Sequence, residues 1–555
     1  MAEAEFGFDL VDQPWINVLD HISGRARAVS LGEIFVRAHE LSLAVDDVLE
    51  AVALLRQVLL PIYWRSVGIP RTDSEWGERW STGHLVPGLS ESELEDVETN
   101  PILAYLAAHR ARFDLFGDEP FGQAAGLRTA RGETRTVAVL ISSIPTGNSV
   151  PLFGVRTDAD PPALTPAQAA RAMLATQCWD TAGLKSGAVD DPFAQQGKSY
   201  GNPTGPVGQL GVVAPLGETI AATLLLNTPV MQRGLSDKDI PPWEMSPLCG
   251  RWSTRSAVGI VDLLTWQARR IRLVPEIGLD GSAVVRRVVV TAGDRLAAVP
   301  IDIEIHTMWR GQANGAAKSG PAAKWPARHH PGREVWRGLQ GLLAIDPATD
   351  REVESSRLLT CLAELRHRSA LPDGVLVRVL TAAMFYGAQS AVVEDVLVDV
   401  VPLPVAALVA DSAVQRVVRD MAMEAEGLHR AAIVLEKQLR TAVRAKPHTV
   451  CRAGEVLTHR LTPLIRETLS VLQQAPDRAE EVAAMWRESA RRLSIETAET
   501  LLAAMPPQAF LGQIDKTPKS GNIFRTNLNS AAARFYRETS NILRDIPVVD
   551  HQEPR

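Results

Sequence analysis

Two short segments contain residue types that phosphate-binding and nucleophilic sites use. Gly197-Lys198-Ser199 looks like the end of a phosphate-binding loop, but that motif needs a glycine five positions earlier, where the chain has Pro192. Residues 183–187, Gly-Leu-Lys-Ser-Gly, do not form a nucleophile elbow, because the serine is not central and no strand clearly precedes it. The only adjacent histidines, His329 and His330, lie in a basic segment, and no His-Glu-x-x-His motif occurs. None of these segments completes a catalytic motif, so we expect that the protein is not an enzyme. A catalytic site built from distant residues stays an alternative.

The cysteines give no sign of a metal site. Cys178, Cys249, Cys361 and Cys451 lie far apart and form no Cys-x-x-Cys pair. This spacing excludes a knuckle-type zinc site and gives no reason to expect disulfides. We therefore expect neither a metal nor another cofactor.

Positive charge is concentrated in one segment, residues 309–337. The net charge of the whole chain is −7, which by itself argues against nucleic acid as a partner. A DNA-binding surface, however, needs only a local patch that displaces counterions from phosphates. The basic residues of the segment, which only Glu334 opposes, are Arg310, Lys318, Lys324, Arg328, Arg333 and Arg337, with His329 and His330 beside them. A solvated basic loop without a partner is the alternative interpretation.

Glycines bound the segment 183–187, and a flexible turn is the ordinary interpretation of such a segment. A functional interpretation is that backbone without side chains can approach a nucleic-acid groove closely. The DNA minor groove requires this, because it is only about 6 Å wide and offers few distinguishing groups. Residues 197–201, which also contain two glycines, could serve the same purpose.

The bulk composition is that of a globular protein with more than one domain. The chain has 555 residues, of which 46% are hydrophobic and 22% charged. It contains no apolar run of about 18 residues that could span a membrane. The first five residues are acidic and lack an apolar core, so we expect no secretion signal and a cytoplasmic location.

The first 400 residues mix short helical and strand patterns. Apolar residues at spacings of three and four predict a helix over 46–60, which paired aspartates begin. The β-branched runs 136–141 and 284–290 predict strands, and strict alternation over 301–305 predicts a half-exposed strand. Because strands and helices do not alternate regularly, the pattern favours an irregular α+β domain.

Two segments of this part are rich in glycine and proline, residues 142–163 and 183–211. Both are predicted to be loops. Long loops in compact domains are usually functional or disordered.

After Pro402 and Pro404 the pattern becomes helical. Sustained spacings of three and four predict four helices, over residues 414–439, 454–472 with a kink at Pro463, 476–505 and 527–543. The long link 506–525 joins the last two. Four helices with mostly short connections predict an antiparallel four-helix bundle. We therefore expect an α+β domain over 1–403 and a helical bundle over 404–555.

Two distant segments together resemble a known family. Residues 8–18 contain Trp15-Ile16-Asn17-Val18 after two aspartates. This resembles the amino-terminal signature of the CasA family, the large subunit of the type I-E CRISPR Cascade, in which an acidic residue precedes Trp-Ile-Pro-Val. Asn17 departs from the proline of that signature. Residues 386–391, Tyr-Gly-Ala-Gln-Ser-Ala, fall where the family has a glutamine wedge at a hairpin tip. Some members carry a cysteine cluster near mid-chain, which this chain lacks.

The resemblance implies a subunit without catalytic activity. Such a subunit recognises the protospacer-adjacent motif in double-stranded target DNA and starts the strand separation that lets guide RNA pair. The implied partners are the CRISPR guide RNA, target DNA, the other Cascade subunits and the helicase–nuclease that is recruited afterwards. The implied role is antiviral defence through R-loop formation, with no membrane involved.

The resemblance also implies roles for particular residues. The motif-reading residues would be Gly183, Leu184, Lys185, Ser186 and Gly187, with Lys318 as a lysine finger and Arg310 or Lys324 as alternatives for that finger. Gln389 with Ser390 would form the wedge, and Phe153 would lie near the handle of the guide RNA. The basic patch would comprise Arg310, Lys324, Arg328, Arg333 and Arg337. A helical scaffold without a nucleic-acid role is the competing hypothesis.

Overall fold

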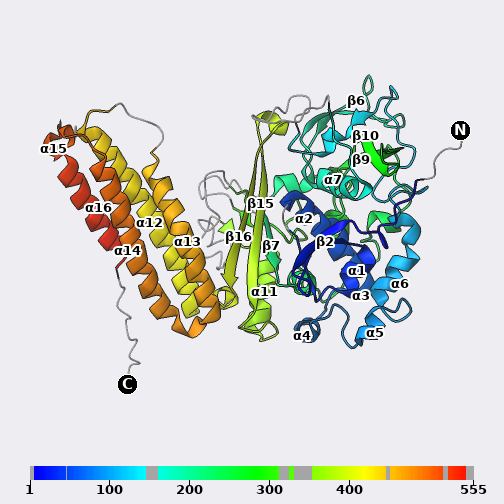
Figure 1. Ribbon diagram of the computed structural model, residues 1–555, viewed down its shortest axis with the longest axis horizontal. Helices are drawn as coiled ribbons and strands as arrows, with labels where there is room; N and C mark the ends of the chain where they lie inside the picture. The colour runs from blue at the N-terminus through cyan, green and yellow to red at the C-terminus, as the bar shows by residue number, and fades with distance from the viewer. Residues whose placement is uncertain are drawn as a thin grey trace, which may run out of the picture. The chain divides into compact units, whose positions relative to one another are not determined.

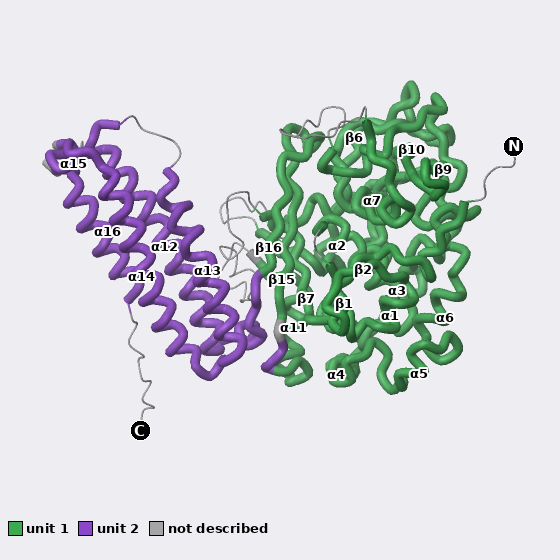
Figure 2. The backbone as a smooth tube through the Cα atoms, in the orientation of Figure 1, with its two compact units in different colours: residues 1–331, 346–372, 377–400 green, residues 332–345, 373–376, 401–555 purple. Residues whose placement is uncertain are grey.

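The chain folds into two compact units, shown in different colours in Figure 2. The structure is a computed structural model that describes residues 6–44, 47–144, 160–311, 324–329, 353–445, 451–516 and 523–544. Unit 1 comprises residues 1–331, 346–372 and 377–400, and unit 2 comprises 332–345, 373–376 and 401–555. Among the described residues, no helix is long and apolar enough to cross a membrane.

A three-stranded antiparallel sheet begins unit 1. Its central strand, β1 (Ile16–Asp20), pairs with β2 (Arg25–Val29) and β3 (Leu41–Leu43). The side chain of Ser30 accepts from the backbone N–H of Glu33 and so caps the following helix, α1 (Leu31–Val36). Trp15 is fully buried, and its indole Nε1 donates to the carbonyl of Leu10 at 3.0 Å.

The helix expected over 46–60 is present and carries a π-helical turn in its middle. It comprises α2 (Val48–Leu54), the π segment Leu55–Leu59 and α3 (Leu60–Val67), and Asp47 caps it as expected. A π turn contains one extra residue and shifts the side chains that follow, and such turns are frequent at special sites. Here the π segment includes Arg56 and Gln57, both buried.

Further helices of unit 1 surround these elements (Figure 1). They are α4 (Asp73–Thr82), α5 (Glu91–Leu94), α6 (Pro101–Ala108), α7 (Pro166–Trp179), α8 (Ile220–Leu226), α9 (Ile260–Leu264) and α11 (Arg357–His367). The N-terminus of α7 has a capping box, in which Thr165 and Gln168 satisfy each other's backbone N–H groups.

A five-stranded sheet carries the glycine-rich part of unit 1. The strand order is β4 (Arg135–Thr136), β10 (Ala283–Ala292), β5 (Gly183–Ser186) and β6 (Lys198–Asn202), with β9 (Arg269–Ile277) paired to β10. The strand expected over 284–290 is therefore confirmed. The segment 183–187, predicted as part of a loop, is mostly a strand, because β10 and β6 supply its backbone hydrogen bonds.

Two other strand predictions are wrong. The β-branched run 136–141 contributes only Thr136 to β4, and Val137–Leu140 form a 3-10 turn in which Val137, Ala138 and Leu140 are buried. Residues 301–305 form no strand. Their alternation reflects Glu304, whose carboxylate turns inward to pair with Arg56.

A long hairpin completes unit 1. Strand β15 (Leu376–Tyr386) lies between β16 (Val393–Pro404) and β7 (Val212–Leu216), and β15 pairs antiparallel with β7. Figure 1 shows β15 and β16 as the two longest strands of the fold. The small sheets pair β8 (Thr254–Arg255) with β11 (Arg295–Leu296), and β12 (Trp309–Arg310) with β13 (Trp325–Pro326) and β14 (Val353–Glu354).

Unit 2 is built on four long helices that lie side by side in Figure 1. They are α12 (Ala413–Ala442), α13 (Ala453–Gln474), α14 (Ala479–Ala503) and α16 (Leu528–Ile542). All four predicted helices are present, and α13 continues past Pro463. The link 506–525 is more structured than expected, because it contains α15 (Gln508–Leu511) and most of a hairpin of β17 (Gln513–Lys516) and β18 (Ile523–Thr526). The predicted α+β class with a helical carboxy-terminal part is thus confirmed.

Candidate nucleic-acid interface

The tip of the β15–β16 hairpin is a tight turn with an unusual backbone. Gln389 and Ser390 both have φ of 55°, and the backbone N–H of Ala391 donates to the carbonyl of Ala388 at 3.2 Å. Two consecutive residues with positive φ are the requirement of a type I′ turn, which normally selects Asn-Gly. A Gln-Ser pair there stores backbone strain, and strained residues cluster at functional sites. Gln389 is exposed at this tip.

The tip is attached to the glycine-bearing strand β5. The backbone N–H of Ala182 donates to the carbonyl of Ser390 at 2.8 Å. Below the tip, the hydroxyl of Tyr386 donates to the carbonyl of Trp179 at 2.6 Å. The fold therefore brings together two of the predicted site segments, 183–187 and 389–390, which are about 200 residues apart in sequence.

The two glycines that bound β5 have different surroundings. Gly183 has φ of 114°, and a Cβ placed there would meet no atom within 4 Å, so the side of the backbone where a Cβ would stand is open. A Cβ on Gly187 would lie 2.5 Å from Cβ of Ala194, so that glycine is needed for internal packing. Between them, Leu184 is 50% exposed. Leu184 is therefore the exposed residue of the predicted motif-reading segment, whereas Gly183, Lys185 and Ser186 are half-buried and Gly187 is buried.

A buried charge cluster holds this corner in place. The Asp180 carboxylate accepts from Lys185 Nζ at 2.7 Å and from Arg269 Nε at 2.5 Å. Arg269 also donates to the carbonyls of Thr181 and Pro203, at 2.9 and 2.8 Å. Lys185, predicted to read the motif, thus has an internal partner, and its side chain is only 15% exposed.

The pKa of Asp180 reflects these contacts. Burial by itself raises the pKa of this carboxyl, but the charges and hydrogen bonds of Lys185 and Arg269 outweigh burial and bring the pKa to about 2. Burial lowers the pKa of Lys185, and the nearby positive charges of Arg269 and Arg135 lower it further, against the opposing effect of Asp180. Asp180 is therefore ionised and satisfied near neutral pH.

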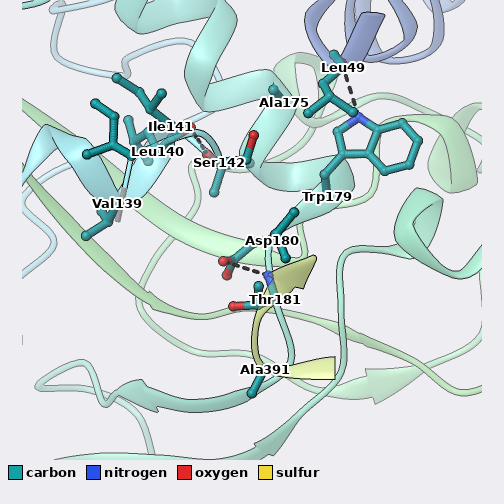
Figure 3. A pocket seen from close by; sticks show the side chains of 13 residues that line it. Leu49, Val139, Leu140, Ile141, Ser142, Ala175, Trp179, Asp180, Thr181 and Ala391 are labelled. Carbon is teal, nitrogen blue, oxygen red and sulfur yellow. Dashed lines mark hydrogen bonds between the residues drawn. The ribbon is translucent and has the colours of Figure 1, made fainter. Parts of the chain in front are cut away.

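Two cavities open around this cluster. The larger, of about 380 Å³, is lined by Arg135, Lys185, Lys198, Ser186, Val139, Val290, Ala391 and residues 180–184. The smaller, of about 100 Å³, lies on the side of Trp179 and Leu140, and Figure 3 shows Asp180, Thr181 and Ala391 at its edge. Trp179 Nε1 donates to the carbonyl of Leu49 there, at 3.2 Å. The segment leading into β5 thus lines both cavities.

The described members of the predicted basic patch differ in the internal contacts and the exposure of their side chains. Lys324 Nζ lies 2.6 Å from Glu354 Oε1, and Arg328 donates to the carbonyls of Gln209 and Gly208 at 3.2 and 3.3 Å. Arg310 is exposed on β12. The remaining predicted residues, Lys318, Arg333, Arg337 and Phe153, lie outside the described residues.

Some residues of the site escaped the sequence analysis. Asp180 and Arg269 carried no recognisable motif, and Arg135 merely preceded a β-branched run. Lys198 was noticed only as the remnant of a phosphate-binding loop. The signal that the sequence offered was the pair Arg269-Arg270 at the start of a run with apolar residues, because an arginine inside such a strand needs an internal partner once it is buried.

The described residues contain no group of three or more His, Cys, Asp or Glu side chains that could hold a metal ion. A different buried cluster, of Arg56, Glu304, His306 and Asn227, is a closed internal network. Arg56 donates to Glu304 at 2.8 Å and to Nδ1 of His306 at 2.8 Å, and Nε2 of His306 lies 2.9 Å from Oδ1 of Asn227. All four residues are buried, which suits a structural role.

Comparison with known proteins connects this architecture to one family. The profile of the family described as CRISPR-associated protein Cse1 matches residues 9–497. The CRISPR-associated protein CasA/Cse1 of Thermus thermophilus is 31% identical over 280 residues, which are 48% of this chain and 49% of that protein. The match thus spans about half the length of this relative.

Solved structures match over nearly the whole chain. Thermobifida fusca Cse1 superposes with a TM-score of 0.82 at 28% identity, covering 97% of this chain and 98% of that chain. Cse1 from Acidimicrobium ferrooxidans gives a TM-score of 0.78 at 29% identity, covering 98% and 99%. A chain of a structure described as a CRISPR RNA-guided surveillance complex has the same fold, with a TM-score of 0.64 at 19% identity over 97% of this chain and 100% of that chain.

Proposed function

Because the chain belongs to the CRISPR-associated Cse1 family, we propose that it is the non-catalytic large subunit of a CRISPR RNA-guided surveillance complex of the Cascade type. In this role it recognises the protospacer-adjacent motif in double-stranded DNA and opens the first target base pair. Its partners are the guide RNA, the other subunits, target DNA and a helicase–nuclease that it helps to recruit in the cytoplasm.

One observation carries the proposal. The exposed, strained tip at Gln389 is hydrogen-bonded through Ser390 to Ala182, the neighbour of Gly183, where the space that a Cβ would occupy is open. A motif reader and a strand-opening wedge must be held at a fixed distance, because the wedge has to meet the base pair next to the motif. The 2.8 Å hydrogen bond between Ala182 and Ser390 supplies such a fixed distance.

The proposed readout of the motif uses Gly183 and Leu184. With nothing near the missing Cβ of Gly183, the backbone can approach a groove that is about 6 Å wide. Lys318 is proposed to reach acceptors on the same motif. Lys318→Ala should then weaken binding to motif-bearing duplex by about 1–3 kcal/mol, and an equal loss on DNA without the motif would make Lys318 a phosphate contact instead.

The proposed wedge is the Gln389 side chain. Inserted beside the motif, it occupies the space of the first target base pair and offsets part of the unstacking cost, a few kcal/mol per step. Guide RNA can then begin to pair with the opened strand. Phe153 is proposed to stack near the guide RNA handle.

Copurification tests the assignment as a complex subunit. Tagged protein expressed beside its genomic neighbours should bring down a small RNA of uniform length together with several other proteins. That assembly should bind motif-bearing duplex DNA with an affinity that falls steeply as salt increases. If the tagged chain instead purified without RNA and without other proteins, and bound no DNA, the result would favour a helical scaffold without a nucleic-acid role.

A further inference from the structure

The larger cavity beside the hairpin tip carries two positive side chains that no internal contact explains. Arg135, on β4, and Lys198, on β6, both line it, and both are exposed. Among the residues that the structure describes, neither side chain has an ion-pair or hydrogen-bond partner. We propose that Arg135 and Lys198 each bind a backbone phosphate of the target DNA duplex next to the hairpin tip. This inference rests on the proposed function and adds the phosphate contacts of the site.

The described lining of the cavity holds no unpaired negative charge that would repel DNA. Among these lining residues Asp180 is the only acidic one, and Lys185 and Arg269 both bind its carboxylate. The lowered pKa of Lys185, due first to burial and then in part to Arg269 and Arg135, is consistent with a positive environment. A site with positive charge in excess and no competing acid suits an anion.

The lining favours phosphate over bases. Apart from the charged residues, its side chains are small hydroxyls at Thr181 and Ser186 and apolar groups. Among the described lining residues there is no Asn or Gln whose side chain could form two hydrogen bonds with one base edge. Arg135 and Lys198 would therefore position the duplex without contributing to sequence preference.

The spacing of the two cations suits a polymer better than a single small anion. Because β9 pairs with β10 along its whole length, β4 and β5 both pair with the other edge of β10, Arg135 opposite Val288 and Ser186 opposite Thr291. Three residues along β10 amount to about 10 Å, and Lys198 lies one strand further out, opposite Ser186, so the two backbones are roughly 11 Å apart. A DNA strand carries one charge per about 3.4 Å of helix axis, so a distance of this size spans several phosphates. Each cation would contact its own phosphate.

The cavity lies next to the hairpin tip, so phosphate contacts there would fix the position of the duplex relative to Gln389. Ala391, at the end of the turn, belongs to the same lining, and Ala182 joins that lining to Ser390. Two phosphate contacts here would hold the duplex at a fixed register while Gln389 acts on one base pair.

The test is the salt dependence of DNA binding by the assembled complex, compared for wild type and Arg135→Ala/Lys198→Ala. Each lost phosphate contact should reduce the slope of log affinity against log salt by about 0.9. Between 50 and 200 mM salt, wild-type affinity should therefore fall about 10-fold more than that of the double variant. The change should be equal on DNA with and without the motif.

Matched variants separate a local contact from a change in net charge. Arg25→Ala/Lys238→Ala removes the same charge from exposed positions outside the cavity lining and should keep the wild-type slope. Arg135→Lys/Lys198→Arg keeps both charges and should restore it. Neutral methylphosphonate linkages, placed one at a time near the first target base pair, should weaken binding by wild type and not further weaken binding by the double variant.

Two salt-dependence results would overturn the inference while leaving the proposed function intact. One is a wild-type slope in the Arg135→Ala/Lys198→Ala complex, and the other is an equal slope change in the Arg25→Ala/Lys238→Ala control. Loss of guide RNA from the double variant would show an RNA contact and would also overturn it. Absence of DNA binding by the wild-type complex itself would instead contradict the proposed function.

Discussion

Arg269→Ala should loosen the corner where the hairpin tip meets β5. Arg269 is 1% exposed and connects the Asp180 carboxylate with the carbonyls of Thr181 and Pro203. Its removal leaves the Asp180 charge with Lys185 as its remaining ionic partner and leaves buried carbonyls without a donor. The hydrogen bond between Ala182 and Ser390, which joins the tip to the segment before β5, depends on the position of residues 180–182. In Arg269→Ala this hydrogen bond should therefore open more often.

The size of the effect follows from burial. Removing one partner of a buried, hydrogen-bonded ion pair costs about 3–5 kcal/mol, because the other charge stays buried. A local opening that becomes easier by about 3 kcal/mol is roughly 100-fold more populated, since each 1.4 kcal/mol is a factor of ten. Arg269→Lys should recover only part of this loss, because an ammonium cannot reproduce the planar fork of guanidinium donors.

Amide hydrogen exchange measures this opening directly. The N–H groups of Ala182 and Gly205, which donate to the carbonyls of Ser390 and Asp180, should lose protection by roughly 100-fold in Arg269→Ala. Arg270→Ala is the matched control on the same strand. Arg270 is also buried, but it binds the carbonyls of Cys249, Arg251 and Gln267 and the Asp294 carboxylate.

The control should lose protection around residues 249–251 and 294 and keep it at Ala182. Unchanged exchange at Ala182 and Gly205 in Arg269→Ala would refute the reasoning. So would an equal loss there in Arg270→Ala, because the effect would then be a general destabilisation of unit 1.

Three further predictions concern acid stability and the tip. Burial, with the nearby charge of Arg56, holds the pKa of His306 well below 6.5, so the unfolded chain takes up a proton that the folded chain excludes. The free energy of unfolding should fall by about 1.4 kcal/mol per pH unit below pH 6.5, measured by urea titration, and His306→Gln should remove this component. Gly183→Ala and Gly187→Ala should both lower the melting temperature, the first because a φ of 114° strains a residue with a Cβ and the second because its Cβ would meet Ala194, but only Gly183→Ala should also impair motif discrimination. Gln389→Gly should relieve the left-handed strain and stabilise the hairpin by about 1 kcal/mol against thermal unfolding, yet slow strand separation as much as Gln389→Ala does.

Periodicity predicted the long elements well. The four helices of unit 2 and strand β10 have sustained patterns, in which many residues contribute to one signal. The short run 301–305 failed because alternation over five residues has a second explanation. Its acidic residue Glu304 is buried by a partner almost 250 residues away, Arg56, which no local pattern can reveal.

The candidate site could be predicted only in pieces. Gln389 and the glycines of 183–187 stood out in sequence, but their contact through Ala182 and Ser390 is a product of the fold. The different surroundings of the two glycines that bound 183–187 were also invisible in the sequence, because the half-buried Gly183 and the packed Gly187 are the same residue type. Their difference lies in the backbone angle and in the neighbour Ala194.

The most direct test of the central claim is the rate of strand separation by the assembled complex on two targets. One target is fully paired, and the other carries a mismatch at the first position beside the motif. Gln389→Ala should slow opening of the paired target more than it weakens initial duplex binding, because the side chain acts on that base pair. On the mismatched target the defect should largely disappear, since the pair no longer has to be broken. An equal defect on both targets would contradict the assignment of Gln389 as the residue that opens the DNA.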